Sequence, residues 1–129
     1  MFGQPMLEDF AVRIDWHLNK ACASGQKAIG SIDAMASATG RYYSGARIRM
    51  VFEASLNEFD QAVTSALGEL KRISSLGKLE MSELRRITGD RLQNFTARMK
   101  TMTKPDKLKE FGPANTIDEF LMEFDTRLS

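Results

Sequence analysis

Few residues of this chain have the types and spacing that catalysis requires. His17 is the only histidine among the 129 residues, and it lies beside Trp16, one position from an apolar stripe. Glu8, Asp9 and Asp15 could share one helix surface, but metal binding or acid–base chemistry would need a histidine at ligand spacing among them. A glycine-rich phosphate loop would have to follow a strand, and the sequence predicts no strand. We therefore expect no enzyme, no cofactor and no metal site.

Cys22 is the single cysteine, so the chain cannot form an internal disulfide. Small residues surround it from Ala21 to Gly25, and a thiol in such a setting usually packs as a small hydrophobic side chain. The five-residue stretch also permits either a close approach of another backbone, which we favour, or a helix break near Gly25. A redox or intermolecular role for the thiol is the less expected alternative.

Charge interrupts the apolar pattern early in the chain. Glu8, Asp9, Arg13 and Asp15 fall within the first twenty residues, which excludes the apolar region of a secretory signal. Elsewhere no apolar run approaches the roughly 18 residues of a membrane span. We expect a cytoplasmic protein without a membrane segment.

A basic segment precedes an acidic C-terminus. Residues 71–109 hold 11 Lys or Arg against 4 Asp or Glu and carry +7, whereas residues 110–129 hold 1 against 5 and carry −4. On a helix, five of the basic residues fall within an arc of about 100°, a surface that could follow phosphates. These nucleic-acid-binding candidates are Lys78, Arg85, Arg86, Lys100 and Lys104. An ordinary solvated basic face is the simpler interpretation.

The sequence around Thr88-Gly89-Asp90 predicts an interruption of the basic helix. Two helices flanking it could be drawn as a helix-turn-helix. Arg85 argues against that motif, because it stands four positions before the glycine, where close helix crossing requires a small residue. Nucleic-acid binding by an accessory or regulatory protein is therefore the alternative function, with only weak contact expected.

The acidic C-terminus is also amphipathic. Thr116-Ile117-Asp118-Glu119 matches a capping box, and Phe120, Leu121 and Phe124 share one face of the helix that follows. This helix could dock on its own bundle, which we favour, on a second copy of the chain, or on another protein as a tethered ligand. Phe120, Leu121 and Phe124 are therefore candidate partner-binding residues.

A second recognition candidate is the cluster Arg41, Tyr42, Tyr43 and Arg47, near the glycines that reverse the chain. Tyr and Arg are enriched at the energetic centres of interfaces. A loop that only anchors its own turn would use the same residues, and we slightly favour this interpretation.

Helical periodicity positions all these residues. The most regular stretch has apolar spacing that alternates 4 and 3, as in helices that wind around a neighbour. This seam consists of Phe52, Leu56, Phe59, Val63, Ala66, Leu70 and Ile73. We predict helices over 5–38, 43–76 and 79–103, the second capped after its end by Gly77. The fold class is all-α, a long antiparallel helical hairpin with a third helix packed on it and a short C-terminal amphipathic helix.

The predicted organisation is a helical bundle domain at 1–103, a linker at 104–115 and the acidic helix at 116–129. Two hairpin helices of about 34 residues would be roughly 50 Å long, more than a third helix of about 25 residues can cover. The uncovered apolar edge predicts a homo-oligomer, most simply a dimer. The predicted function is a non-enzymatic helical interaction or assembly module that also binds an unidentified protein partner.

Overall fold

The computed structural model describes residues 3–77 and 79–128, with side chains from Pro5 onward. Its helices are α1 (Gly3–Ala38), α2 (Gly45–Ser74), α3 (Met81–Met102), α4 (Pro105–Lys109) and α5 (Ala114–Leu128), and the described residues contain no strand. The fold is all-α, as predicted. No helix in the described part of the chain is long and apolar enough to cross a membrane.

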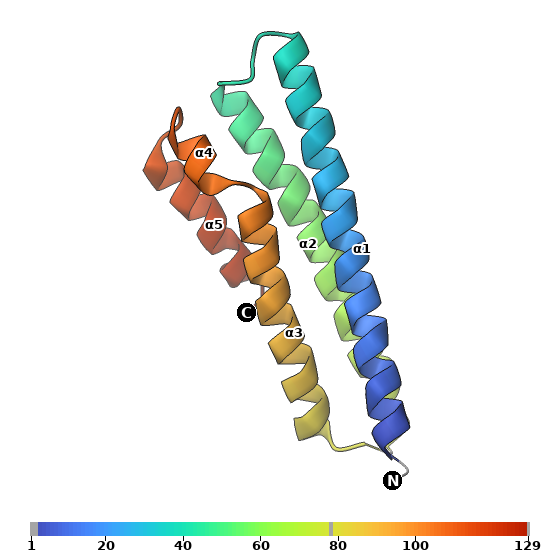
Figure 1. Cartoon of the computed structure of the whole chain (residues 1–129). Coiled ribbons are helices and arrows are strands. Elements are labelled where there is room, and N and C mark those ends of the chain that lie inside the picture. Colours follow the sequence, from blue (N-terminus) through green and yellow to red (C-terminus); the bar gives the residue numbers. More distant parts are fainter. Residues whose placement is uncertain (1–2, 78, 129) are drawn as a thin grey trace.

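The long hairpin of α1 and α2 forms the frame of the molecule (Figure 1). The helix α3 packs on both of them along the half that holds the start of α1 and the end of α2. In the other half, α4 and α5 lie beside α2, and α5 runs in the same direction as α2 (Figure 1). The second half of α1 therefore receives no covering helix comparable to α3.

The residues on either side of α2 explain where the helix begins and how the chain turns after its end. The Ser44 hydroxyl accepts a hydrogen bond from the Arg47 backbone N–H at 3.1 Å, which satisfies one of the free donors of the first turn. After α2 ends at Ser74, Gly77 has a φ of 64°, a left-handed conformation that glycine adopts without strain. The predicted hairpin turn and the glycine after α2 are thus confirmed.

The predicted seam of α2 is the centre of the core. The Phe59 side chain is 0% exposed, and its ring stacks on Phe95 of α3 at a centroid distance of 5.4 Å. The same ring meets Phe124 of α5 edge-on at 5.2 Å. Phe59 therefore joins three helices. Of the other seam residues, Phe52, Leu56, Ala66 and Ile73 are buried, and Val63 and Leu70 are half-buried against the same core.

The predicted interruption of α3 is wrong, and so is the helix-turn-helix drawn around it. The helix continues through Thr88-Gly89-Asp90, and the Thr88 hydroxyl donates to the Leu84 carbonyl oxygen at 2.8 Å. Leu84 and Leu92 are buried on either side of Gly89. Their packing outweighs the roughly 1 kcal/mol that one glycine costs a helix.

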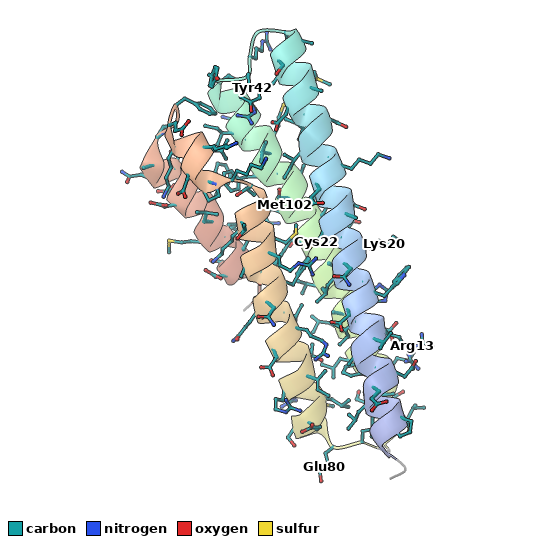
Figure 2. The ribbon with its side chains drawn as sticks, in the orientation of Figure 1. Arg13, Lys20, Cys22, Tyr42, Glu80 and Met102 are labelled. Atoms are coloured by element: carbon teal, nitrogen blue, oxygen red, sulfur yellow. The ribbon has the colours of Figure 1, made fainter. Side chains whose placement is uncertain are left out.

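The stretch of small residues in α1 remains helical, so the alternative of a break at Gly25 is wrong, and side chains of α3 rather than its backbone pack against this glycine. A Cβ atom at Gly25 would lie 2.6 Å from the terminal methyl of Met102, at the end of α3. Cys22 is buried nearby, and desolvation raises the pKa of its thiol despite the opposing charge of Arg98. Figure 2 shows Cys22 and Met102 close to one another between the two helices. Cys22 thus packs as a small apolar residue.

The residues expected to form a linker pack against the bundle. Segment 104–115 contains α4, and Leu108 is a buried member of the core. The following helix α5 begins at Ala114, two residues before the predicted capping box, and the Ile117 N–H bonds to the Pro113 carbonyl oxygen at 3.2 Å. Ile117 is fully buried. The helix α5 docks on its own chain, which is the arrangement we favoured.

Candidate interaction surfaces

Arg47 organises the tip of the hairpin. Its side chain is 8% exposed, and its Nε donates to Asp33 Oδ1 of α1 at 2.7 Å. One terminal nitrogen donates to the Tyr42 carbonyl oxygen at 3.2 Å, and the guanidinium lies 3.9 Å from the centroid of the Tyr42 ring. Arg47 and Tyr42 therefore anchor the turn internally. Tyr42 marks this tip in Figure 2.

The other two members of the predicted cluster face outward. Tyr43 is 75% exposed, with its ring edge-on to Tyr42 at 5.0 Å and to Phe111 at 5.2 Å. Arg41 is also exposed. The structure thus brings all four predicted tip residues to one end of the hairpin, where Arg41 and Tyr43 are exposed, Tyr42 is half-buried and Arg47 is buried.

An apolar groove lies between α1 and α2 at the same end, where no third helix covers them. We call it the tip groove; it has a volume of about 120 Å³. Met35 is 61% exposed and Met50 42% exposed on its two sides. The sequence predicted an uncovered apolar edge, but the hairpin register was needed to place these residues together. The lining residues are Ile32, Met35, Ala36, Thr39, Arg41, Ser44, Ala46, Arg47 and Met50.

The predicted partner-binding residues of α5 contact the bundle itself. Phe124 is fully buried against Phe59. Phe120 is half-buried and stacks on Phe52 with a centroid distance of 4.8 Å and nearly parallel rings. Leu121 is half-buried against the same core. Only the exposed part of Phe120 lines an open surface.

That surface is a larger groove between α2 and α5, with a volume of about 590 Å³. Leu56 and Phe120 provide its apolar part. Sequence reasoning missed this α2–α5 groove. The signal that could have found it is the spacing of four carboxylates, seven apart in α2 and four apart in α5. Its complete lining is Glu53, Leu56, Asn57, Asp60, Thr116, Glu119, Phe120, Glu123 and Arg127.

The predicted basic face of α3 is partly neutralised by the chain's own acids. Arg86 pairs with Glu83 at 2.6 Å, and this hydrogen bond holds the pKa of the Glu83 carboxyl below its ordinary value. Lys100 pairs with Asp125 of α5 at 2.8 Å. Arg85 and Lys104 are exposed and form no ion pair within the described part of the chain. The fifth candidate, Lys78, lies outside the described residues.

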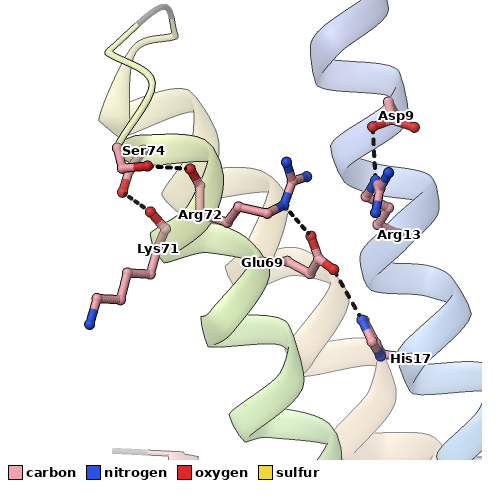
Figure 3. A network of polar contacts seen from close by, with 8 residues as sticks. Asp9, Arg13, His17, Glu69, Lys71, Arg72 and Ser74 are labelled. Atoms are coloured by element: carbon pink, nitrogen blue, oxygen red, sulfur yellow. Dashed lines mark hydrogen bonds and ion pairs between the residues drawn. The ribbon is translucent and has the colours of Figure 1, made fainter.

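His17 belongs to a polar network that joins α1 to α2 (Figure 3). Its Nε2 lies 3.2 Å from Glu69 Oε1, and Arg72 Nε donates to Glu69 Oε2 at 3.1 Å. Burial raises the pKa of the Glu69 carboxyl, but the hydrogen bonds from His17 and Arg72 together outweigh burial and lower it. The lone histidine therefore has a structural partner.

The lowered pKa of Glu69 predicts a specific pH dependence. Ionised Glu69 stabilises the fold above its unfolded pKa, near 4.5, and this contribution is lost as the pH falls through the lower folded pKa. At pH 7 we expect Glu69→Gln to reduce the free energy of unfolding by about 1 kcal/mol. Urea denaturation should show the difference from wild type shrinking below about pH 4.5. A difference that stays constant down to about pH 3 would contradict this role, and Glu53→Gln, at an exposed position, is the matched control.

In residues 3–77 and 79–128, no group of three or more His, Cys, Asp or Glu side chains is placed to hold a metal ion. Comparison of the chain with models of protein families, with curated proteins and with solved structures found no match.

Proposed function

We propose that this chain is a non-enzymatic helical interaction module that forms a dimer and binds another protein in the cytoplasm. The observation that carries this proposal is the tip groove. Large exposed apolar side chains that gather in one place mark interaction sites more often than isolated ones do. Methionine is well suited to such a surface, because its flexible, polarisable side chain adapts to the facing residue.

The extent of helical cover explains why this surface is available. In α1, Phe10, Ile14 and Leu18 are buried beneath α2 and α3, whereas beyond Gly25 Ile29 and Ile32 are only half-buried and Met35 is exposed. A second copy could supply the missing cover by placing its own tip groove against the first. A two-fold arrangement of this kind closes after two subunits.

Self-association gives the direct test of this proposal. Sedimentation at micromolar concentration should give a mass near twice 14.5 kDa. The double variant Met35→Glu/Met50→Glu should sediment as a monomer, because two carboxylates on each copy would have to be desolvated at the contact. The control is Met122→Glu, which places one such carboxylate at a 65% exposed position of α5. A monomeric wild type, or a dimer insensitive to the double variant, would refute the tip groove as the dimer contact.

Nucleic-acid binding receives less support as the alternative. Two of its four described candidate residues, Arg86 and Lys100, are occupied by carboxylates of the same chain. Binding to phosphates would have to compete with Glu83 and Asp125. We therefore expect only weak, strongly salt-dependent association with duplex DNA, carried by Arg85 and Lys104.

A further inference from the structure

We infer that the α2–α5 groove is a docking site for a basic amphipathic helix of a partner protein. This inference rests on the proposed function, because it names the chemistry of the protein that the interaction module binds. The α2–α5 groove is a different surface from the tip groove, so an experiment can refute the dimer contact and the docking site independently.

The groove has the composition of a helix-binding surface. The buried Leu56 and the half-buried Phe120 form an apolar strip at the floor of the groove, and Glu53 and Glu119 are exposed beside it. An amphipathic helix binds such a groove by laying its apolar face on the strip. The lining residues of α5 extend from Thr116 to Arg127, which corresponds to roughly 16 Å of helix. This length accommodates about three turns of a partner helix, with anchors at i, i+3 or i+4, and i+7.

Charge decides which amphipathic helix fits. The groove is lined by four carboxylates and one cation, Arg127, and therefore carries −3. Arg127 is already paired with Asp60 of α2 and with Glu123 of α5, the latter at 3.2 Å. At the other end, Glu53 and Glu119 have no ion pair within the described part of the chain. Lysine or arginine beside the partner's apolar stripe would complement these two carboxylates, whereas an acidic helix would be repelled.

The groove is also held open before any partner binds. Phe120 stacks on Phe52 and Phe124 is buried against Phe59, so α5 is fixed to α2 from below the groove. The Arg127 pairs join the two walls at one end. A preformed surface of this kind loses less conformational entropy on binding.

The test uses a fluorescent 18-residue peptide of Leu, Lys and Ala, with Leu on one helical face and Lys on both flanks. A second peptide replaces every Lys with Glu. Fluorescence anisotropy with the full chain should show binding of the Lys peptide that weakens with added salt, and no binding of the Glu peptide. Glu53→Gln/Glu119→Gln should weaken binding at least tenfold. The control Glu80→Lys changes the net charge by the same amount at the N-terminal end of α3, away from the groove (Figure 2). It should leave the affinity for the Lys peptide within twofold of that of the wild type.

Four results would overturn the inference. The Lys peptide could fail to bind, the Glu80→Lys control could weaken binding as much as the groove variant, or Met35→Glu/Met50→Glu could abolish binding while the groove variant does not. Dissociation of a dimer by Glu53→Gln/Glu119→Gln would also overturn it, by making a second copy the occupant. Peptide binding by a monomeric wild type would instead refute self-association and leave the groove assignment intact.

Discussion

Phe59→Ala is expected to lower the free energy of unfolding by about 3–5 kcal/mol, the range for truncating a fully buried phenylalanine. The side chain has no exposed surface and contacts the rings of Phe95 and Phe124. Its removal leaves a cavity where α2, α3 and α5 meet. Since each of these helices is held by the same ring, no single one can shift to fill the space without loosening another. Urea or guanidinium denaturation followed by circular dichroism measures the effect.

Leu67→Ala is the matched control for this prediction. Leu67 lies on the same helix but is 48% exposed, so its truncation should cost less than about 1 kcal/mol. Similar losses in the free energy of unfolding for the two variants would mean that the two faces of α2 do not differ in burial. The assignment of the core would then be wrong.

The seam of α2 was predictable because the spacing of the apolar residues within one helix indicates which face of that helix is packed. Residues 52, 56, 59, 63, 66, 70 and 73 are close in sequence, and the side chains of a helix at these positions must share a face. The docking of α5 was also predictable in kind, from the apolar face that carries Phe120 and Phe124. Its start at Ala114 was not, because the capping box at Thr116 is a local signal and packing of Ile117 against the core extends the helix.

The errors and omissions have a common physical origin. The sequence predicts a break around Gly89 because the cost of a glycine within a helix is visible locally, whereas the burial of Leu84 and Leu92 against other helices is not. The α2–α5 groove was missed because its walls are more than fifty residues apart in sequence. The relative placement of α2 and α5 depends on which aromatic rings meet, and periodicity alone does not specify those pairs.

Arg47→Met is the second substitution with a large expected effect, about 2–3 kcal/mol of stability. Methionine keeps much of the apolar length of the side chain but removes every donor. Asp33 then loses its counter-ion, the Tyr42 carbonyl oxygen loses a donor, and the Tyr42 ring loses the guanidinium above it. Removing one partner of a fully buried ion pair costs about 3–5 kcal/mol. We expect less, because the Asp33 side chain is 31% exposed.

The control Arg49→Met removes the same charge two residues later, at an exposed position of α2, and should change stability by less than about 0.5 kcal/mol. Asp33→Asn and the double variant complete a thermodynamic cycle, in which a coupling of about 1–2 kcal/mol is expected for the pair. If Arg47→Met were as mild as Arg49→Met, the guanidinium would not be holding the turn. Arg47 also lines the tip groove, so stability and self-association are both measured for Arg47→Met. If Arg47 has a structural role, the substitution lowers the free energy of unfolding together with any dimerisation. If Arg47 has only a recognition role, the substitution weakens dimerisation alone.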